Sequence, residues 1–304
     1  MSAFQIRGLP MGKITASPLL FEQMKSFVCL AQTLNLSKTV RELETTRQTV
    51  RRHIAQLEEM KGEALFRVED RRYLLTDAGQ HSLREAQELI ARGEAWVNNA
   101  SGHINGLFHL SAKHVKGFTY HLQQQSLSAM WQSKSPLLSF GVRRWAAAKG
   151  QIESPEFKPL RPYLMVFRRL VNDWICVEVG DKSSFATWYG WRWERSSVGR
   201  GVADLPGGTG FANLLSQPFQ ETHLTEGIRL DHIHTRIRAA DSEEMVPISY
   251  ERLLMGCFFP DGSRAIAALI NRTHDINIKG LSDETAQSMP SALIMHFAQA
   301  DVVL

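Results

Sequence analysis

Apolar residues recur at helical spacing near the start of the chain. The first stripe follows Pro18, and its members come at intervals of four, three and four residues: Leu20, Met24, Phe27 and Ala31. Ser37 is expected to cap a second, shorter helix that carries Val40 and Leu43. A third stripe lies in residues 45–58, TTRQTVRRHIAQLE, where one face holds Val50, Ile54 and Leu57. The pattern therefore predicts three consecutive amphipathic helices.

The third helix carries an unusual outer face. Thr45 is its expected N-cap, because Gln48 follows at the spacing of a capping box. The side that points away from the apolar stripe holds Arg47, Gln48, Thr49, Arg51 and Arg52, and no carboxylate follows until Glu58. Arg and Gln can pair in bidentate fashion with guanine and adenine edges. This face is either a surface for an electronegative partner or a solvated basic face.

A hairpin and a long helix are predicted next. Gly62 can end the third helix in the left-handed conformation. The apolar runs Leu65-Phe66 and Tyr73-Leu74-Leu75 flank a charged tip at residues 69–72, which predicts a β-hairpin wing. Residues 76–99 then predict a long helix with one apolar stripe, formed by Leu83, Ala86, Ile90 and Val97.

Residues 20–79 resemble the winged helix-turn-helix of LysR-type transcriptional regulators. The resemblance has no gap and is carried by Phe27, Ala31, Leu43, Val50, Arg52, Ile54, Leu57, Glu58, Gly62, Leu65-Phe66, Arg71, Leu75-Thr76 and Ala78-Gly79. The chain departs from the usual family residues at Leu34-Asn35-Leu36, Thr39-Val40, Arg47-Gln48 and Arg51. The base preference of better-known members therefore cannot be transferred to this chain.

The resemblance implies roles for these residues. Gln48, Thr49 and Arg52 would contact bases, and Lys38, Arg47 and Arg51 would hold phosphates. Arg71 and Arg72 would reach the flanking backbone or the minor groove from the wing. In this family the long helix is a linker through which two chains pair, so Leu83, Ala86, Ile90 and Val97 would form a dimer seam. The alternative is a helix that packs only on its own domain.

The rest of the chain has a different character. A tail (1–18), the winged helix (19–79) and the linker (80–100) are followed by an expected helical connector at 101–156. Residues 157–281 predict two strands, WICVEVG and FATWYGW, then a Gly-rich stretch, and then three strands, the last two joined by the turn Pro260-Asp261-Gly262-Ser263. Residues 282–304 predict a C-terminal helix that starts at Pro290.

The order of these strands resembles that of a PAS domain, particularly the PAS-like sensor domains of alphaproteobacteria. The predicted fold class is thus α+β and multidomain, with an N-terminal winged helix-turn-helix, a long linker helix and a C-terminal PAS-like antiparallel sheet with short helices. A diverged periplasmic-binding-protein-like effector domain, which is usual in LysR-type regulators, stays open as an alternative on the basis of chain length. It would require alternating helices and parallel strands.

One aromatic set could line a ligand pocket or simply fill a core: Trp174, Phe185, Trp188, Tyr189, Trp191 and Phe211. His232 and His234 would face one side of a strand, more in the manner of solvent-facing residues than of metal ligands. Cys176 and Cys257 are expected to be small core residues. No P-loop and no catalytic triad signature occurs in the sequence, so neither an enzyme nor a required cofactor or metal is predicted.

Composition and charge narrow the function. Net charge is +4 and the isoelectric point about 9.0, which is only mildly basic. The three cysteines are widely spaced and suggest no disulfide framework. We expect a cytoplasmic transcriptional regulator without a membrane span. Its expected partners are double-stranded DNA, a second copy of itself in a homodimer or higher oligomer, and a small-molecule effector. The rival hypothesis is a ligand-free PAS dimerisation or interaction protein.

Overall fold

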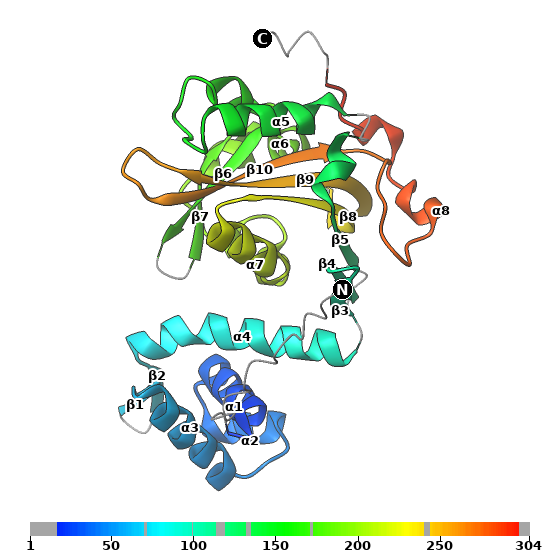
Figure 1. The fold of residues 1–304 in the computed structure, drawn as a ribbon. Helices are drawn as coiled ribbons and strands as arrows, with labels where there is room; N and C mark the ends of the chain where they lie inside the picture. Colours follow the sequence, from blue (N-terminus) through cyan, green and yellow to red (C-terminus); the bar gives the residue numbers. More distant parts are fainter. Residues whose placement is uncertain are drawn as a thin grey trace, which may run out of the picture. The chain divides into compact units, whose positions relative to one another are not determined.

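The structure is a computed structural model that describes residues 17–69, 72–98, 100–113, 119–131, 135–170, 173–239 and 244–297. It divides into two compact units, Met1–Gly93 and Glu94–Leu304, and each is described by itself. The first unit is helical with one hairpin, and the second is built on an eight-stranded sheet with flanking helices (Figure 1). The α+β class is confirmed. Within the described ranges, no helix combines the length and apolar character needed to span a membrane.

Three helices form the core of the first unit: α1 (Leu20–Thr33), α2 (Leu36–Glu42) and α3 (Arg47–Lys61). Their apolar stripes meet in one buried cluster that includes Phe27, Leu30, Val50, Ile54 and Leu57. Two expected caps shift by one or two positions. Asn35, not Ser37, caps α2, and Thr46, not Thr45, caps α3, where its Oγ1 accepts the amide of Thr49. Gly62 ends α3 at a φ of 72°, as predicted.

A hairpin of β1 (Phe66–Glu69) and β2 (Arg72–Leu75) follows, and then the long helix α4 (Asp77–Val97). One joint holds these parts together. The Glu58 carboxylate accepts the backbone amides of Leu65 and Phe66 at 2.7 and 3.1 Å. Thr76 Oγ1 donates to the Ala64 carbonyl at 2.6 Å and accepts the amide of Gly79 at 3.0 Å. The motif residues of the resemblance therefore fasten the wing to both helices.

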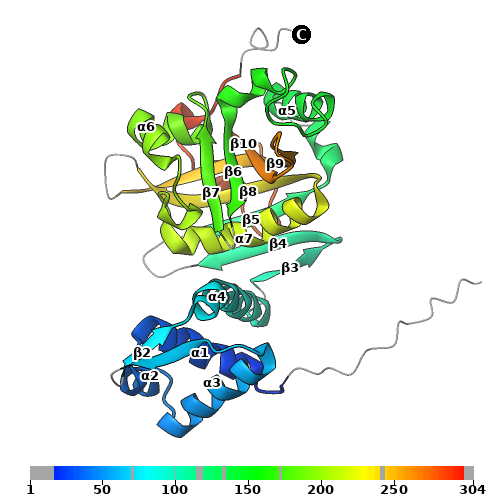
Figure 2. The same ribbon diagram turned by 90° about the vertical axis from the view of Figure 1, so that its left-hand side faces the viewer.

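The second unit contains one antiparallel sheet in the order β3-β4-β5-β8-β9-β10-β6-β7 (Figure 2). Its strands in chain order are β3 (Ser101–Ile104), β4 (Leu107–Lys113), β5 (Thr119–Gln125), β6 (Leu164–Leu170), β7 (Asp173–Val179), β8 (Ile228–Arg238), β9 (Met245–Phe258) and β10 (Arg264–Arg272). Because β5 and β8 are neighbours, the sheet joins segments that lie more than a hundred residues apart in the chain.

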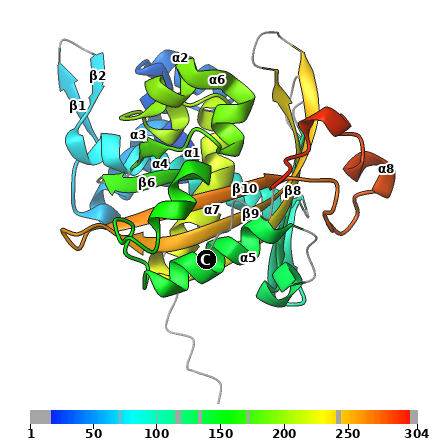
Figure 3. The same ribbon diagram turned by 90° about the horizontal axis from the view of Figure 1, so that it is seen from above.

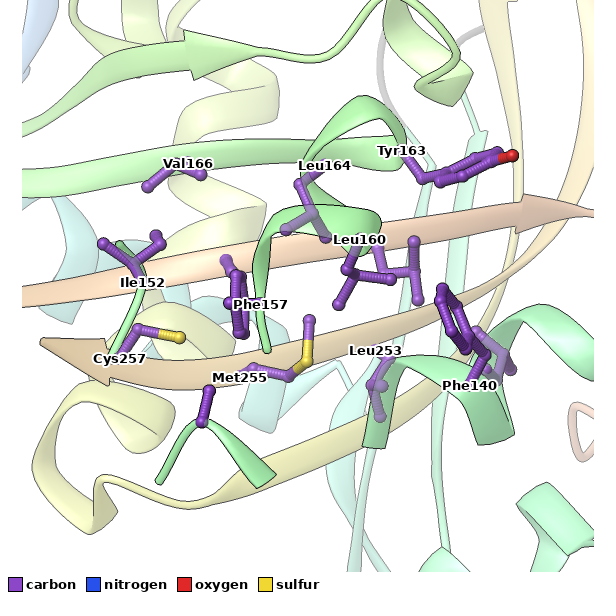
Figure 4. Close-up of a cluster of buried hydrophobic side chains, with 14 of the residues drawn as sticks. Phe140, Ile152, Phe157, Leu160, Tyr163, Leu164, Val166, Leu253, Met255 and Cys257 are labelled. Carbon is purple, nitrogen blue, oxygen red and sulfur yellow. The ribbon is translucent and has the colours of Figure 1, made fainter. Parts of the chain in front are cut away.

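Helices cover both faces of this sheet. On one face, α5 (Pro136–Ala147) lies alongside β9 and β10 (Figures 1 and 3), and the 3-10 helix η2 (Lys158–Tyr163) contacts α5 and β6. Phe140, Leu253 and Met255 belong to the buried cluster between them (Figure 4). On the other face, α7 (Gly208–Thr225) and η3 (Val202–Asp204) pack over β6, β9 and β10. Helix α6 (Ser184–Ser197) contacts β7 and β10.

The predicted helical connector is wrong for residues 101–125, which form β3, β4 and β5. The signal for a hairpin is present in the sequence as Asn105-Gly106, whose φ values of 53° and 81° suit the tight turn between β3 and β4. The remainder of that segment does contain helix, in η1 (Leu127–Trp131) and α5. Local pattern alone did not reveal these strands, because they are short and the second pairing partner of β5, strand β8, lies far away in the chain.

The predicted strand FATWYGW is also wrong, since these residues lie in α6. Ser183 caps this helix by accepting the amide of Ala186, and Gly190 interrupts it at a φ of 78°. The high β propensity of the aromatic residues was overridden by the cap and by tertiary packing. The first strand of the pair is instead β6. At the C-terminus the structure has α8 (Asp283–Ala286) and only the short η4 (Ser291–Leu293), so the helix predicted from Pro290 is absent as far as residue 297. Residues 298–304 lie outside the described ranges.

Candidate functional site

The outer face of α3 is exposed and basic. Arg47, Gln48, Arg51 and Arg52 are all exposed, and Thr49 is half-buried. The opposite side of the helix packs Val50, Ile54 and Leu57 into the core, which fixes the direction in which the arginines point. The next carboxylate along the helix, that of Glu58, is turned toward backbone amides of its own domain. The outer face is thus positively charged over the first two turns of α3, with no carboxylate among its arginines.

Neighbouring residues support this face from α2 and the wing. Arg47 Nη2 donates to Ser37 Oγ at 2.8 Å, which orients its side chain across the start of both helices. Lys38 is exposed, but its Nζ lies 3.9 Å from the Glu42 carboxylate, so part of its charge is offset. Arg72 is exposed on β2. Arg71, the other wing residue of the prediction, lies outside the described ranges.

The residues predicted to form a dimer seam on α4 divide into two groups. Ala86 is buried in the core of its own unit, and Leu83 packs against the same core. Ile90 is half-buried, whereas Val97 is 69% exposed. Two further apolar residues of this helix are uncovered within the described structure, Leu89 at 52% and Trp96 at 71% exposure.

A cavity of about 930 Å³ lies inside the second unit, between one face of the sheet and the helices α6 and α7. Such a volume suits a drug-sized or larger organic molecule. Its walls are mainly apolar and aromatic, with contributions from Phe185, Trp188, Phe211, Ile248 and Tyr250. The cavity is therefore bounded by residues from three helices, α6, η3 and α7, and four strands, β6, β8, β9 and β10, which only the tertiary fold brings together.

The predicted aromatic set is only partly at this cavity. Phe185, Trp188, Tyr189 and Phe211 line it. Trp174 does not, because it is buried on β7 with its ring 5.6 Å from that of Phe219 in an edge-to-face arrangement. Trp191 is not among the lining residues and is 64% exposed. The expectation that Trp174, Trp188 and Trp191 lie on two adjacent strands is wrong, because the last two belong to α6.

Two buried arginines line the cavity that sequence analysis did not single out. Arg252 Nη2 donates to Asp231 at 2.8 Å, and Asp231 also accepts from Arg229, which pairs in turn with Glu221. Arg272 is 7% exposed and donates to the Leu293 carbonyl and to Ser184 and Thr187 on α6. Burial lowers the pKa of Arg272 to about 10. An arginine in a strand is usually exposed, so the pattern carried no signal for either residue.

The two strand histidines are buried, contrary to the prediction that they face solvent. His232 is 8% exposed and its Nδ1 accepts the backbone amide of Asn277 at 2.7 Å. His234 is 3% exposed, and its Nδ1 donates to Ser249 Oγ, whose own proton goes to the Ala286 carbonyl. Burial lowers the pKa of both to about 4, so both are neutral at pH 7.

Metal and thiol chemistry find little support in the described parts of the chain. There, no group of three or more His, Cys, Asp or Glu side chains is arranged to hold a metal ion. All three cysteines are buried as free thiols, and for Cys176 and Cys257 this confirms the prediction that they are small core residues. Burial raises the pKa of Cys176 and of Cys257 to about 12, which keeps both protonated and unreactive.

Comparison with known proteins places residues 21–80 in a known domain family. They match the family model described as "Bacterial regulatory helix-turn-helix protein, lysR family". The HTH-type transcriptional activator AllS of Klebsiella pneumoniae is 34% identical over 83 residues, which are 27% of this chain and 29% of the relative. The chain thus aligns with less than a third of the length of that curated relative.

Solved structures with a similar segment include a DNA complex of the CbnR DNA-binding domain. It is 24% identical, covers 26% of this chain and 91% of that one, and has a TM-score of 0.25. The DNA complex of the BenM DNA-binding domain at catB site 1 is 24% identical, with coverages of 27% and 98% and a TM-score of 0.25. CbnR, a LysR family transcriptional regulator, is 28% identical, with coverages of 26% and 29% and a TM-score of 0.24. The family assignment rests on the model match alone, which covers the helix-turn-helix at residues 21–80.

Proposed function

We propose that this chain is a sequence-specific DNA-binding transcriptional regulator that acts as a dimer. The observation that carries the proposal is the exposed outer face of the first two turns of α3, which is positive and without a carboxylate, within a helix-turn-helix that matches the lysR family. In such motifs the second helix of the turn enters the major groove with its N-terminal residues foremost. The residues at that end of α3 are Arg47, Gln48, Arg51 and Arg52.

Each side chain has a role in this proposal. Gln48, Thr49 and Arg52 contact base edges, and Arg47, Arg51 and Lys38 contact phosphates. The bond from Arg47 to Ser37 supports a phosphate role, because it holds the guanidinium where the two helices begin. Arg71 and Arg72 contact the flanking duplex from the wing.

Selection from a random DNA library, followed by affinity measurement on the selected sequence, tests the proposal. Arg52→Ala should weaken binding to that sequence by about 1–3 kcal/mol and relax the preference at one position of each half-site. Arg143→Ala is the matched control, because Arg143 is an exposed arginine of α5 in the other unit. Equal binding by Arg52→Ala and wild type, with folding intact, would remove α3 as the reading helix.

The dimer contact is proposed for α4. Its exposed apolar residues Leu89, Trp96 and Val97 are better placed for this role than Leu83 and Ala86, which their own core covers. A twofold partner also doubles the DNA contacts of a single winged helix on a palindromic site. The seam therefore uses a neighbouring strip of the helix, together with Ile90 and Val97 of the original prediction.

For the second unit we propose a PAS-like sensor. Support comes from the order β7-β6-β10-β9-β8 and from the succession of two strands, intervening helices and three strands. Every strand ladder described in this sheet is antiparallel, which weighs against the parallel strands of a periplasmic-binding-protein-like domain. The cavity then holds a small-molecule effector whose binding shifts the dimer between two states of different DNA affinity.

The rival function is a ligand-free interaction module. It predicts that the cavity is closed by side chains in solution and that no small molecule stabilises the protein. The volume of the cavity favours sensing, because well-packed cores contain few voids larger than a water molecule.

A further inference from the structure

The charged residues that line the cavity are all of one sign. Four arginines contribute to its walls, Arg236, Arg238, Arg252 and Arg272, and the described lining contains no Asp or Glu. Arg236 and Arg238 are exposed at the end of β8, where solvent screens them. Arg252 and Arg272 are buried, so their charges act on the cavity with little screening.

These two buried arginines differ in how their charge is balanced. Arg252 is paired with Asp231 at 2.8 Å, and the cluster of Arg229, Arg252, Asp231 and Glu221 contains two positive and two negative groups. Arg272 has only neutral partners among the described residues, namely carbonyls and hydroxyls of Ser184, Thr187 and Leu293. The cavity wall therefore keeps one buried positive charge that no described carboxylate offsets.

A buried charge without a counter-ion is costly, and a ligand can supply the missing partner. Ser184 lines the cavity beside Arg272 and offers a hydroxyl for the same ligand group. In the β9–β10 ladder, Arg272 lies opposite Tyr250, and Ile270 lies opposite Arg252. The strand wall of the cavity therefore places charged and apolar side chains next to one another. Beyond them the wall is formed by Trp188, Phe211 and Ile248.

We propose that the cavity binds an amphipathic organic monoanion, an aromatic or aliphatic carboxylate, whose acid group pairs with Arg272. The apolar body occupies the space between Trp188, Phe211 and Tyr250. A single excess charge selects a monoanion over a cation or a neutral molecule of the same shape. This inference rests on the proposed function, since it names the chemical class of the effector.

The test uses two fluorescent probes of nearly the same shape on the full-length protein. 1-Anilinonaphthalene-8-sulfonate is an anion, and N-phenyl-1-naphthylamine is its neutral counterpart. Wild type should bind both, and Arg272→Met should weaken binding of the anion at least ~10-fold, as expected for one lost charge-assisted contact, while the neutral probe binds as before. Arg272→Lys retains the charge and should restore part of the anion's affinity. Arg143→Met, at an exposed arginine of α5 that is not among the cavity-lining residues, should change neither probe.

A second measurement needs no variant and keeps the inference testable if Arg272→Met does not fold. In wild type, decanoate should displace the neutral probe at concentrations at least ~10-fold lower than decanamide does. Equal competition by acid and amide, or equal anion binding by Arg272→Met, would overturn the inference and leave the sensor proposal standing. If neither probe binds wild type, the ligand cavity of the proposed function fails together with it.

Discussion

Gly79→Ala tests how the wing is joined to α4. Gly79 lies inside the first turns of α4, where a glycine-to-alanine change ordinarily stabilises a helix by roughly 0.5–1 kcal/mol. Here a Cβ would sit 2.1 Å from the Leu65 carbonyl oxygen and 3.0 Å from its carbon, and both are backbone atoms that no rotamer change can move. The helix start must therefore retreat from β1.

This displacement of the start of α4 breaks the hydrogen bonds that connect it to the segment before β1. Thr76 donates its backbone amide to the Leu65 carbonyl at 3.1 Å and its hydroxyl to the Ala64 carbonyl at 2.6 Å. Each bond contributes about 0.5–1.5 kcal/mol, so losing both costs about 1–3 kcal/mol. After the helical gain is subtracted, we expect a net loss of roughly 0.5–2 kcal/mol in the first unit, the opposite sign from helix propensity alone.

The assay separates the two units by their signals. Residues 1–93 contain no tryptophan, and of the seven tryptophans only Trp96 lies on α4, so tryptophan fluorescence mainly follows the second unit, whereas far-ultraviolet circular dichroism follows both. In urea, Gly79→Ala should lower the midpoint of the dichroism transition and leave the fluorescence transition unchanged. Gly210→Ala is the control, because it lies in α7 with no atom within 4 Å of a built Cβ, and it should raise the fluorescence midpoint. An unchanged or raised dichroism midpoint for Gly79→Ala would refute the close approach.

Three further predictions concern the second unit and the dimer. Burial lowers the pKa of His232 to about 4, against about 6.5 in the unfolded chain. The free energy of unfolding is therefore highest above pH 6.5 and falls by roughly 2–4 kcal/mol as the pH drops toward 4. In urea titrations, His232→Gln should reduce this dependence on pH, whereas the control His103→Gln, at an exposed histidine, should not. Trp188→Ala removes part of the cavity wall and should abolish any ligand-induced rise in melting temperature. It should lower the stability of the ligand-free protein by less than the ~3–5 kcal/mol that the same change costs in a filled core. A larger loss of stability, with no carboxylate that raises the melting temperature, would favour the interaction module. Leu89→Asp should shift the mass measured by light scattering toward that of a monomer, because Leu89 is exposed on α4. Leu83→Asp should mainly destabilise the first unit, because Leu83 packs against its core. An unchanged mass for Leu89→Asp would place the dimer contact elsewhere.

The sequence by itself determined the first unit almost completely. Helical spacing located α1, α3 and α4, because one apolar face per helix is enough to form a small three-helix core. The roles of Glu58, Gly62, Thr76 and Gly79 can also be predicted from the sequence, because each of these residues contacts a segment that is close to it in the chain. In the second unit, β8, β9 and β10 were also predicted, because they are long and a Pro-Asp-Gly-Ser turn joins the last two.

Tertiary structure alone decided the rest of the second unit. Strands β3 to β5 join the rest of the sheet through β5, which pairs with β8, as at Leu122 and Ile233, and no local pattern encodes so distant a partner. The aromatic run of α6 has strand propensity, yet the Ser183 cap and packing on β7 and β10 make it a helix. The cavity and the burial of Arg272 arise where α6 meets β10, since burial is a property of the assembled layers and cannot be read from the residues on one strand.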